Sequence, residues 1–323
     1  MTVDIERQDP LARNARADDA ADAQADRTSH AERTPSALRD YIALTKPAIN
    51  RMCLVMVTGG ILLANRHAAT PEVSLWLVVA ALLGTALAVA SANALNMWLE
   101  RDSDGLMKRT KDRPLPNRRI SDRGALLFGV ALGAVGVAVL LAGTNLLTAL
   151  IGLFAIVSYV AIYTPLKRRS PFSLHVGAIP GAVPPLMGWT AVSGHLDAPA
   201  LVLFGILFVW QIPHFIAIAI FRQREYEAAG IRTTPSAHGL RAATWEAVIW
   251  AALLIPMSLL LIACDVAGPL YATVVSVAGV LFLARVLAGF RAPVPARWAR
   301  QVFVGSLLYL PILVAGLGID VLL

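Results

Sequence analysis

Residues 73–104 read VSLWLVVAALLGTALAVASANALNMWLERDSD, a long apolar run that ends in a short acidic segment. The apolar part, 73–99, exceeds the roughly 20 residues that a helix needs to cross a bilayer. A strand of a membrane barrel would alternate polar and apolar side chains, whereas this run is apolar all round. The stretch therefore predicts a membrane-spanning helix over 73–99 whose end carries polar chemistry.

Runs of the same kind recur along the rest of the chain. Hydrophobic residues make up 57% of its 323 residues and charged residues only 15%, whereas an ordinary soluble domain is about 25% charged. This composition excludes a disordered chain and argues against a soluble enzyme. We expect an all-α, polytopic membrane bundle of nine transmembrane helices, the other eight lying at about 48–65, 123–142, 145–163, 174–193, 199–221, 243–263, 267–288 and 299–319.

The basic residues predict the orientation of the bundle. If the nine spans alternate in direction, 27 of the 28 Lys and Arg residues fall on one side and Arg66 alone on the other. Positive charge accumulates on the cytoplasmic side of membrane proteins. We therefore expect a cytoplasmic N-terminus and an external C-terminus. The net charge of +7 is explained by this topology, and no nucleic acid partner is expected.

Residues 1–38 differ in composition from everything that follows. They are rich in Asp, Arg and Ala and show no apolar period. Such a segment buries too little apolar surface to offset the entropy of ordering it. It also lacks the 7–15-residue apolar core of a signal peptide. We expect a disordered cytosolic tail over 1–38 and one membrane domain over 39–323.

The acidic end of the first stretch places several oxygen donors together. Asn96, Glu100 and Asp104 are spaced by four residues, so successive side chains are offset by only about 40° around a helix. All three should line one face of the cytosolic helix end. Asp102 points elsewhere on a regular helix, although a break at Gly105 would let it swing in.

Hard cations such as Mg²⁺ prefer oxygen ligands and share them with phosphates. A basic cluster follows the acidic face at once, and acidic ligands followed by cations suit a metal–diphosphate complex. The alternative is a solvated loop whose charges only set topology; the regular spacing at the end of an apolar helix favours the metal site. The basic residues of the cluster are Lys108, Arg109, Lys111 and Arg113.

Two weaker candidates lie further along the chain. Glu225 and Tyr226 sit in the loop after the sixth span, where Glu225 would complete a second metal or diphosphate half-site. His214 lies inside the sixth span, and an ionisable side chain in a membrane helix is a functional hypothesis by default; a packed, hydrogen-bonded core histidine is the alternative. The histidines form no HExxH motif, so a zinc hydrolase is not supported.

The segment NMWLERDSDGLMKRTKDRPLP (96–116) resembles the Asn- and Asp-rich signature of the intramembrane (UbiA-type) aromatic prenyltransferases. Three more segments are similar to their protohaem IX farnesyltransferase branch: DYIALTKPAINRM (40–52), YTPLKRRSPFSLHVGAIPGAVPPLMGW (163–189) and PHFIAIAIFRQREYEAAGI (213–231). The resemblance covers roughly residues 38–320. It implies a nine-helix bundle around a central cavity in the bacterial inner membrane, with the active site facing the cytoplasm.

The activity that the resemblance implies is transfer of farnesyl from farnesyl diphosphate to a vinyl group of protohaem IX, giving haem O and diphosphate. Mg²⁺ is the implied cofactor, haem B the implied acceptor substrate, and a downstream haem-modifying enzyme or oxidase assembly a further implied partner. The residues carried over are Asn96, Glu100 and Asp104 as catalytic metal ligands, Asp102 and Glu225 as further metal ligands, Lys108 and Arg109 as catalytic cations, Lys111, Arg113, Lys167 and Tyr226 as diphosphate contacts, and His214 as a haem contact.

The chain departs from the family pattern at several positions. Glu100 and Glu225 stand where the family usually has Asp, which keeps a carboxylate but lengthens the side chain. Residues 232–234, Arg-Thr-Thr, replace apolar and Pro residues. Two alternatives therefore stay open: a prenyltransferase of another aromatic acceptor, such as a quinone precursor, and a non-catalytic haem-binding membrane paralogue.

Overall fold

The structure is a computed structural model and describes residues 37–67, 73–107 and 109–322. Most of the expected N-terminal tail, 1–36, therefore lies outside the described residues. The described chain is helical throughout, without strands, in agreement with the predicted fold class. The first helix, α2 (Ala37–Leu44), begins inside the segment that composition assigns to the tail, and it docks on the bundle through an ion pair between Asp40 and Arg119.

Long helices follow α2 and lie close to the predicted spans. Their bounds are α3 (Pro47–His67), α4 (Leu75–Asp104), α5 (Asp122–Gly143), α6 (Leu146–Val157), α8 (Ser173–Ser193), α9 (Ala198–Phe221), α11 (Thr234–Ala263), α12 (Pro269–Leu287) and α13 (Pro295–Leu322). Shorter elements connect them: the π-helical turn η1 (Ser158–Tyr163), α7 (Thr164–Leu166), α10 (Gln223–Ala228) and the 3₁₀ turn η2 (Ala288–Arg291).

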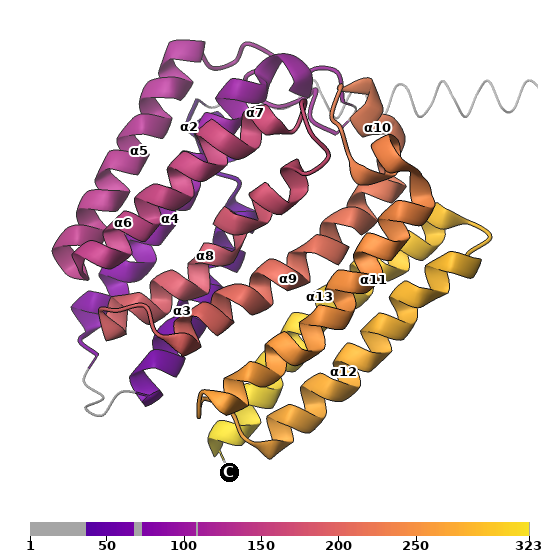
Figure 1. The fold of residues 1–323 in the computed structure, drawn as a ribbon. Coiled ribbons are helices and arrows are strands. Elements are labelled where there is room, and N and C mark those ends of the chain that lie inside the picture. The colour runs from indigo at the N-terminus through magenta and orange to yellow at the C-terminus, as the bar shows by residue number, and fades with distance from the viewer. Residues whose placement is uncertain (1–36, 68–72, 108, 323) are drawn as a thin grey trace, which may run out of the picture.

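Eight helical segments of the described chain are long and apolar enough to cross a membrane. The ninth expected span corresponds to α8, which is long enough at 21 residues but less apolar, because prolines, glycines and polar residues interrupt it. Figure 1 shows α2 at one end of the bundle and the C-terminal end of α13 at the other, as an odd number of alternating crossings requires. Eight of the nine predicted spans are therefore confirmed by length and composition in the described chain, and the span predicted at 174–193 stays a prediction.

Two groups of helices form the bundle. In one, α4 packs on α5 and α3 packs on α8; in the other, α11 packs on α9 and α12 on α13. The contact between α8 and α9 joins the groups (Figure 1). Large apolar side chains cover the outside, such as Leu127 on α5, which is 69% exposed. Because a soluble protein rarely exposes apolar surface on this scale, the protein is a multi-pass membrane protein.

Capping explains where several helices begin. The Ser74 side chain accepts a hydrogen bond from the backbone N–H of Leu77 at 3.1 Å and starts α4. At α11, Thr233 and Ser236 form a capping box. That box starts α11 nine residues before the predicted span at 243, and the helix then bends at Gly239, where φ is +81°. Capping boxes satisfy the backbone donors that a helix start leaves free, so they set boundaries that an apolar run does not reveal.

Candidate functional site

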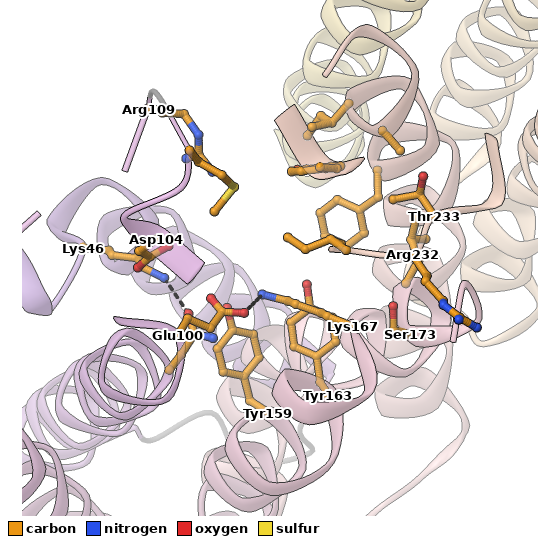
Figure 2. A pocket seen from close by; sticks show the side chains of 18 of the residues that line it. Lys46, Glu100, Asp104, Arg109, Tyr159, Tyr163, Lys167, Ser173, Arg232 and Thr233 are labelled. Atoms are coloured by element: carbon orange, nitrogen blue, oxygen red, sulfur yellow. Dashed lines mark hydrogen bonds and ion pairs between the residues drawn. The ribbon is translucent and has the colours of Figure 1, made fainter. Parts of the chain in front are cut away.

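A cavity of about 270 Å³ opens at the end of the bundle where α2, α7 and α10 lie (Figures 1 and 2). Its walls come from the turn before α3 and the start of α3, from the end of α4 and the loop that follows, from η1 and the residue after α7, and from α8, α9, α10 and the segment 231–233 that precedes α11. The polar and charged lining residues are Lys46, Asn96, Glu100, Asp104, Arg109, Arg113, Tyr159, Tyr163, Lys167, Ser173, Tyr226, Arg232 and Thr233.

One wall of the cavity carries Asn96, Glu100 and Asp104, as their spacing on α4 predicts. Asn96 and Asp104 are each only 1% exposed. Lys167 Nζ lies 2.8 Å from Glu100 Oε1, and Arg113 Nη1 lies 2.6 Å from Asp104 Oδ2. Each buried carboxylate therefore has a cation of the chain beside it.

Asn96 joins the same wall to two other segments. Lys46 Nζ donates to its Oδ1 at 2.9 Å, and its Nδ2 donates to Thr164 Oγ1 at 3.1 Å. Lys46 stands in the turn between α2 and α3, which Asn93 of α4 contacts through a hydrogen bond to the carbonyl of Thr45. The side chain of Asn96 thus fixes the position of one cation and of the start of α7.

The loop after α4 folds back over the helix end and brings Arg113 to the wall. Met107, Leu115 and Ile120 bury their side chains in this loop. The hydroxyl of Thr110 donates to the carbonyl oxygen of Asp104 at 2.8 Å. Burial of these apolar side chains holds the loop in place, and it positions Arg109 and Arg113 at the cavity, whereas Lys111 stays exposed outside the lining.

The π-helical turn η1 presents two tyrosines to the cavity. Tyr159 and Tyr163 have ring centroids 5.1 Å apart, and Lys167 Nζ lies 4.5 Å from the Tyr163 centroid. The hydroxyl of Thr164 donates to the carbonyl oxygen of Tyr159 at 2.8 Å. A Cβ on Gly177 of α8 would overlap the Tyr163 ring, so this close approach requires glycine. Single π-turns inside α-helices frequently mark functional sites.

The cations of the cavity differ in their electrostatic environment. Burial, together with the nearby charges of Arg113 and Lys167, lowers the pKa of Lys46 to about 7. Burial alone would also lower the pKa of Lys167, but Tyr163 and Glu100 outweigh it and raise that pKa above its ordinary value. The same cavity therefore lowers the pKa of one lysine and raises that of the other.

A second, smaller cavity of about 100 Å³ lies deeper in the bundle, between α3, α4, α6 and α8. Its lining is mostly apolar, with Val89, Ile156 and Met187 among its residues. Ile49 and Tyr159 line both cavities. The Tyr159 ring therefore stands at the junction between a charged space and an apolar one.

The acidic wall has the donor chemistry of a site for a hard cation. Asp104 Oδ1 is buried without a hydrogen-bond partner in the described part of the protein. Among residues 37–67, 73–107 and 109–322, no three His, Cys, Asp or Glu side chains converge as a complete metal cage. Two carboxylates and one amide suit Mg²⁺, which usually binds one or two carboxylates plus substrate phosphates and water.

Several predicted site residues lie apart from this cavity. The helix stays regular through Asp104, so Asp102 is exposed, and Lys111 is also exposed outside the lining. Glu225 lies outside the lining too and pairs with Arg222 at 3.1 Å. His214 packs between α9 and α13, where Nδ1 lies 2.8 Å from Ser306 Oγ and the ring stacks on Trp210. Lys108 lies outside the described residues.

The structure adds cavity residues that sequence reasoning did not single out as site residues. Lys46, Tyr159 and Tyr163 line the cavity, as does Arg232 from the atypical 232–234 segment. Lys46 and Tyr163 lie within segments 40–52 and 163–189, whose similarity to the prenyltransferase branch was the sequence signal that could have found them. Tyr159 lies inside an apolar run, and only the π-turn turns it toward the cavity.

The sequence profile of the UbiA prenyltransferase family matches residues 53–308. A protein of Sorangium cellulosum named protoheme IX farnesyltransferase is 47% identical over 281 residues, covering 83% of this chain and 99% of that protein. A Myxococcus xanthus protein of the same name is 44% identical over 292 residues, covering 90% of this chain and 98% of that protein.

Solved structures share the fold. A digeranylgeranylglyceryl phosphate synthase superposes with a TM-score of 0.73 at 17% identity, covering 88% of this chain and 98% of that one. A UbiA homologue from Archaeoglobus fulgidus, bound to GPP and Mg²⁺, gives a TM-score of 0.59 at 20% identity, covering 86% of this chain and 99% of that one.

Proposed function

Because the chain belongs to the UbiA prenyltransferase family, we propose that it is a protohaem IX farnesyltransferase, a transferase that makes haem O. It transfers farnesyl from farnesyl diphosphate to a haem vinyl group, with net addition of water and release of diphosphate. The observation that carries the proposal is the 47% identity to a protein of that name across 99% of its length. A cavity with an acidic wall and cations beside it supports the same reaction.

The acidic wall is the proposed metal site. Asn96, Glu100 and Asp104 would hold a Mg²⁺ ion, and the unpartnered Asp104 Oδ1 is a donor that this role would satisfy. When bound, such an ion neutralises diphosphate charge and makes diphosphate a better leaving group. Asp102 and Glu225 lie outside the cavity lining, so the proposal gives them no ligand role in this conformation.

The cations of the wall are proposed to receive the leaving group. Lys167 and Arg113 pair with the carboxylates and line the same cavity, and Arg109 and Tyr226 line it as well. Fixed positive groups aimed at developing negative charge stabilise its formation without reorganisation. The proposal therefore assigns these residues to diphosphate, in line with the sequence prediction.

The smaller cavity is proposed to take the start of the farnesyl chain. Its apolar lining suits an isoprenoid, and it meets the charged cavity at Ile49 and Tyr159. The carbon that leaves diphosphate would then lie beside Tyr159. Apolar walls exclude water that would otherwise consume the reactive chain.

We also propose that the protein lies in the bacterial inner membrane with this cavity facing the cytoplasm. The cavity lies at the end of the bundle that carries α2, α7 and α10, and the described basic residues between α4 and α5 and at 167–169 lie at that end. Basic residues remain on the cytoplasmic side. Haem O would then be released toward a downstream haem-modifying enzyme or an oxidase under assembly.

Purified protein in lipid vesicles tests the reaction directly. We expect haem O and diphosphate from farnesyl diphosphate and protohaem IX when Mg²⁺ is present, and neither product after chelation. Replacing haem with 4-hydroxybenzoate should give no prenylated product. Prenylation of 4-hydroxybenzoate without haem O would favour the quinone-precursor alternative, and no diphosphate release with either acceptor would favour a non-catalytic paralogue.

A further inference from the structure

Two arginines of the larger cavity are not engaged by an acidic group. Lys167 and Arg113 form ion pairs with the carboxylates, and Lys46 donates to Asn96. Among the described residues, neither Arg109 nor Arg232 has a salt bridge or side-chain hydrogen bond, although both line the cavity. Figure 2 shows Arg232 on the side of the cavity away from Asp104 and Arg109.

The backbone of Arg232 is held firmly at this place. Its N–H donates to the carbonyl oxygen of Lys167 at 3.0 Å, and the N–H of Ile231 donates to the carbonyl oxygen of Tyr226 at 2.9 Å. The capping box that begins at Thr233 anchors the next residue. The segment is therefore joined to Lys167 just after α7 and to α10, and it places Arg232, whose side chain is exposed, at the cavity edge.

The wall around Arg232 differs from the acidic wall. Its lining residues from α8, α9 and the 231–233 segment are largely apolar: Leu174, Phe215, Ile218, Ala219 and Ile231. The charged residues other than Arg232 come from the turn before α3, from α4 with its following loop, and from the residue after α7. Most charged residues thus lie on one side of the cavity, and the exposed Arg232 lies beside Ser173 and Thr233 at the edge of a mostly apolar side (Figure 2).

The charges of the cavity leave an excess for an anionic second substrate. Five cationic and two acidic side chains line it, an excess of three positive charges when Lys46 is protonated. A prenyl diphosphate would add about three negative charges to the cavity, and one Mg²⁺ ion would add two positive charges. About two positive charges therefore remain for other anions, which charged clefts attract from solution.

We propose that Arg232 binds a propionate carboxylate of the haem acceptor and so helps to select it. The inference rests on the proposed function and deepens it. Protohaem is a flat apolar ring with two carboxylates at one edge, which matches an apolar wall with a guanidinium at its edge. Arginine pairs with carboxylates through two parallel hydrogen bonds, so it fixes orientation as well as affinity.

The test uses purified protein, farnesyl diphosphate, and either protohaem IX or its dimethyl ester, in which both carboxylates are blocked. Arg232→Gln should raise the KM for protohaem about tenfold, equivalent to about 1.4 kcal/mol, and leave the KM for farnesyl diphosphate and kcat near wild type. Wild type and Arg232→Gln should handle the dimethyl ester alike. Arg232→Lys should recover part of the affinity for protohaem.

Arg224→Gln is the matched control, because it removes the same charge from an exposed position on α10 outside the cavity lining. It should behave as wild type with both acceptors. Binding can also be measured without turnover, by titrating haem or its ester into protein that lacks farnesyl diphosphate and Mg²⁺ and following the absorbance. This measurement gives the same comparison of affinities if a variant loses activity through instability.

Three results would overturn the proposal. A raised KM for farnesyl diphosphate with unchanged haem affinity would assign Arg232 to diphosphate. Equal affinities of wild type and Arg232→Gln for protohaem would make Arg232 a surface residue. Undiminished affinity of the wild type for the dimethyl ester would remove carboxylate recognition altogether. Failure of the wild type to form haem O at all would instead refute the proposed function.

Discussion

Each carboxylate on the acidic wall is paired with a cation of the chain: Glu100 with the distant Lys167, and Asp104 with Arg113 on the returning loop. Removing one partner of a buried pair costs more than the pair contributes, because it leaves a charge without compensation. We propose that these cations would contact a diphosphate if a metal ion were held by the carboxylates.

Asp104→Asn tests the acidic wall. The change keeps the size of the side chain but removes the charge that would hold Mg²⁺, so we expect haem O formation to fall by at least about 100-fold. The protein should still insert and fold. Asp102→Asn, two residues earlier and exposed, makes the same chemical change outside the cavity and should keep near wild-type activity. Equal activity of the two variants would remove Asp104 from the metal role.

Tyr159 tests the junction of the cavities. Tyr159→Leu removes an aromatic contact worth about 0.5–1.5 kcal/mol and lets water reach the reacting chain. We expect the ratio of haem O formed to diphosphate released to fall by up to about tenfold, with farnesol as the by-product. Tyr159→Phe keeps the ring and should keep the ratio. If Tyr159→Leu keeps the wild-type ratio of haem O to diphosphate, the Tyr159 ring does not shield the farnesyl chain from water.

The spacing of Asn96, Glu100 and Asp104 was sufficient to predict one shared face, because helix geometry alone places them there. The helix stays regular to Asp104, so the same geometry also puts Asp102 outside. Lys46 and Arg232 reach the cavity only through turns and loop contacts. No local pattern encodes such contacts, and sequence reasoning accordingly missed these residues as site residues or noted them only as departures.

At the scale of elements, apolar runs predicted the positions of the long helices well, since hydrophobic length is the dominant requirement in a bilayer. Two features were not predicted from the apolar runs: the early start of α11, and the π-helical turn η1 that continues α6. A capping box sets the first, and an i+5 hydrogen bond from Thr164 N–H to the Tyr159 carbonyl marks the second. Hydropathy does not depend on these local hydrogen bonds, so a hydropathy pattern cannot predict them.

The contact between α3 and α8 yields a prediction about stability. A Cβ on Gly60 would overlap the carbonyl oxygen of Pro185, whereas a Cβ on Gly59 would meet no atom within 4 Å. Gly60→Ala should therefore force the helices apart and cost about 1–3 kcal/mol. The adjacent change Gly59→Ala should leave stability unchanged or slightly improved. Thermal unfolding in detergent measures both, and equal midpoints would contradict the close packing.

At the scale of the whole molecule, Figure 1 shows α2 and the C-terminal end of α13 at opposite ends of the bundle, which predicts that they lie on opposite sides of the membrane. With the basic loops inside, a C-terminal alkaline phosphatase fusion should be active in the periplasm and a C-terminal green fluorescent protein fusion dark. The same reporters fused after Arg119 should behave in the opposite way. The reverse pattern at both positions would place the cavity at the outer surface, where cytosolic farnesyl diphosphate does not reach it.

The most direct test of the central claim is mass analysis of haem extracted from a bacterial strain that lacks haem O and expresses this protein. The account predicts that haem O appears with the wild-type chain and is absent with Asp104→Asn at equal membrane abundance. No haem O from the wild type, or equal yields from both, would contradict the claim that the α4 oxygen ligands drive farnesyl transfer to haem.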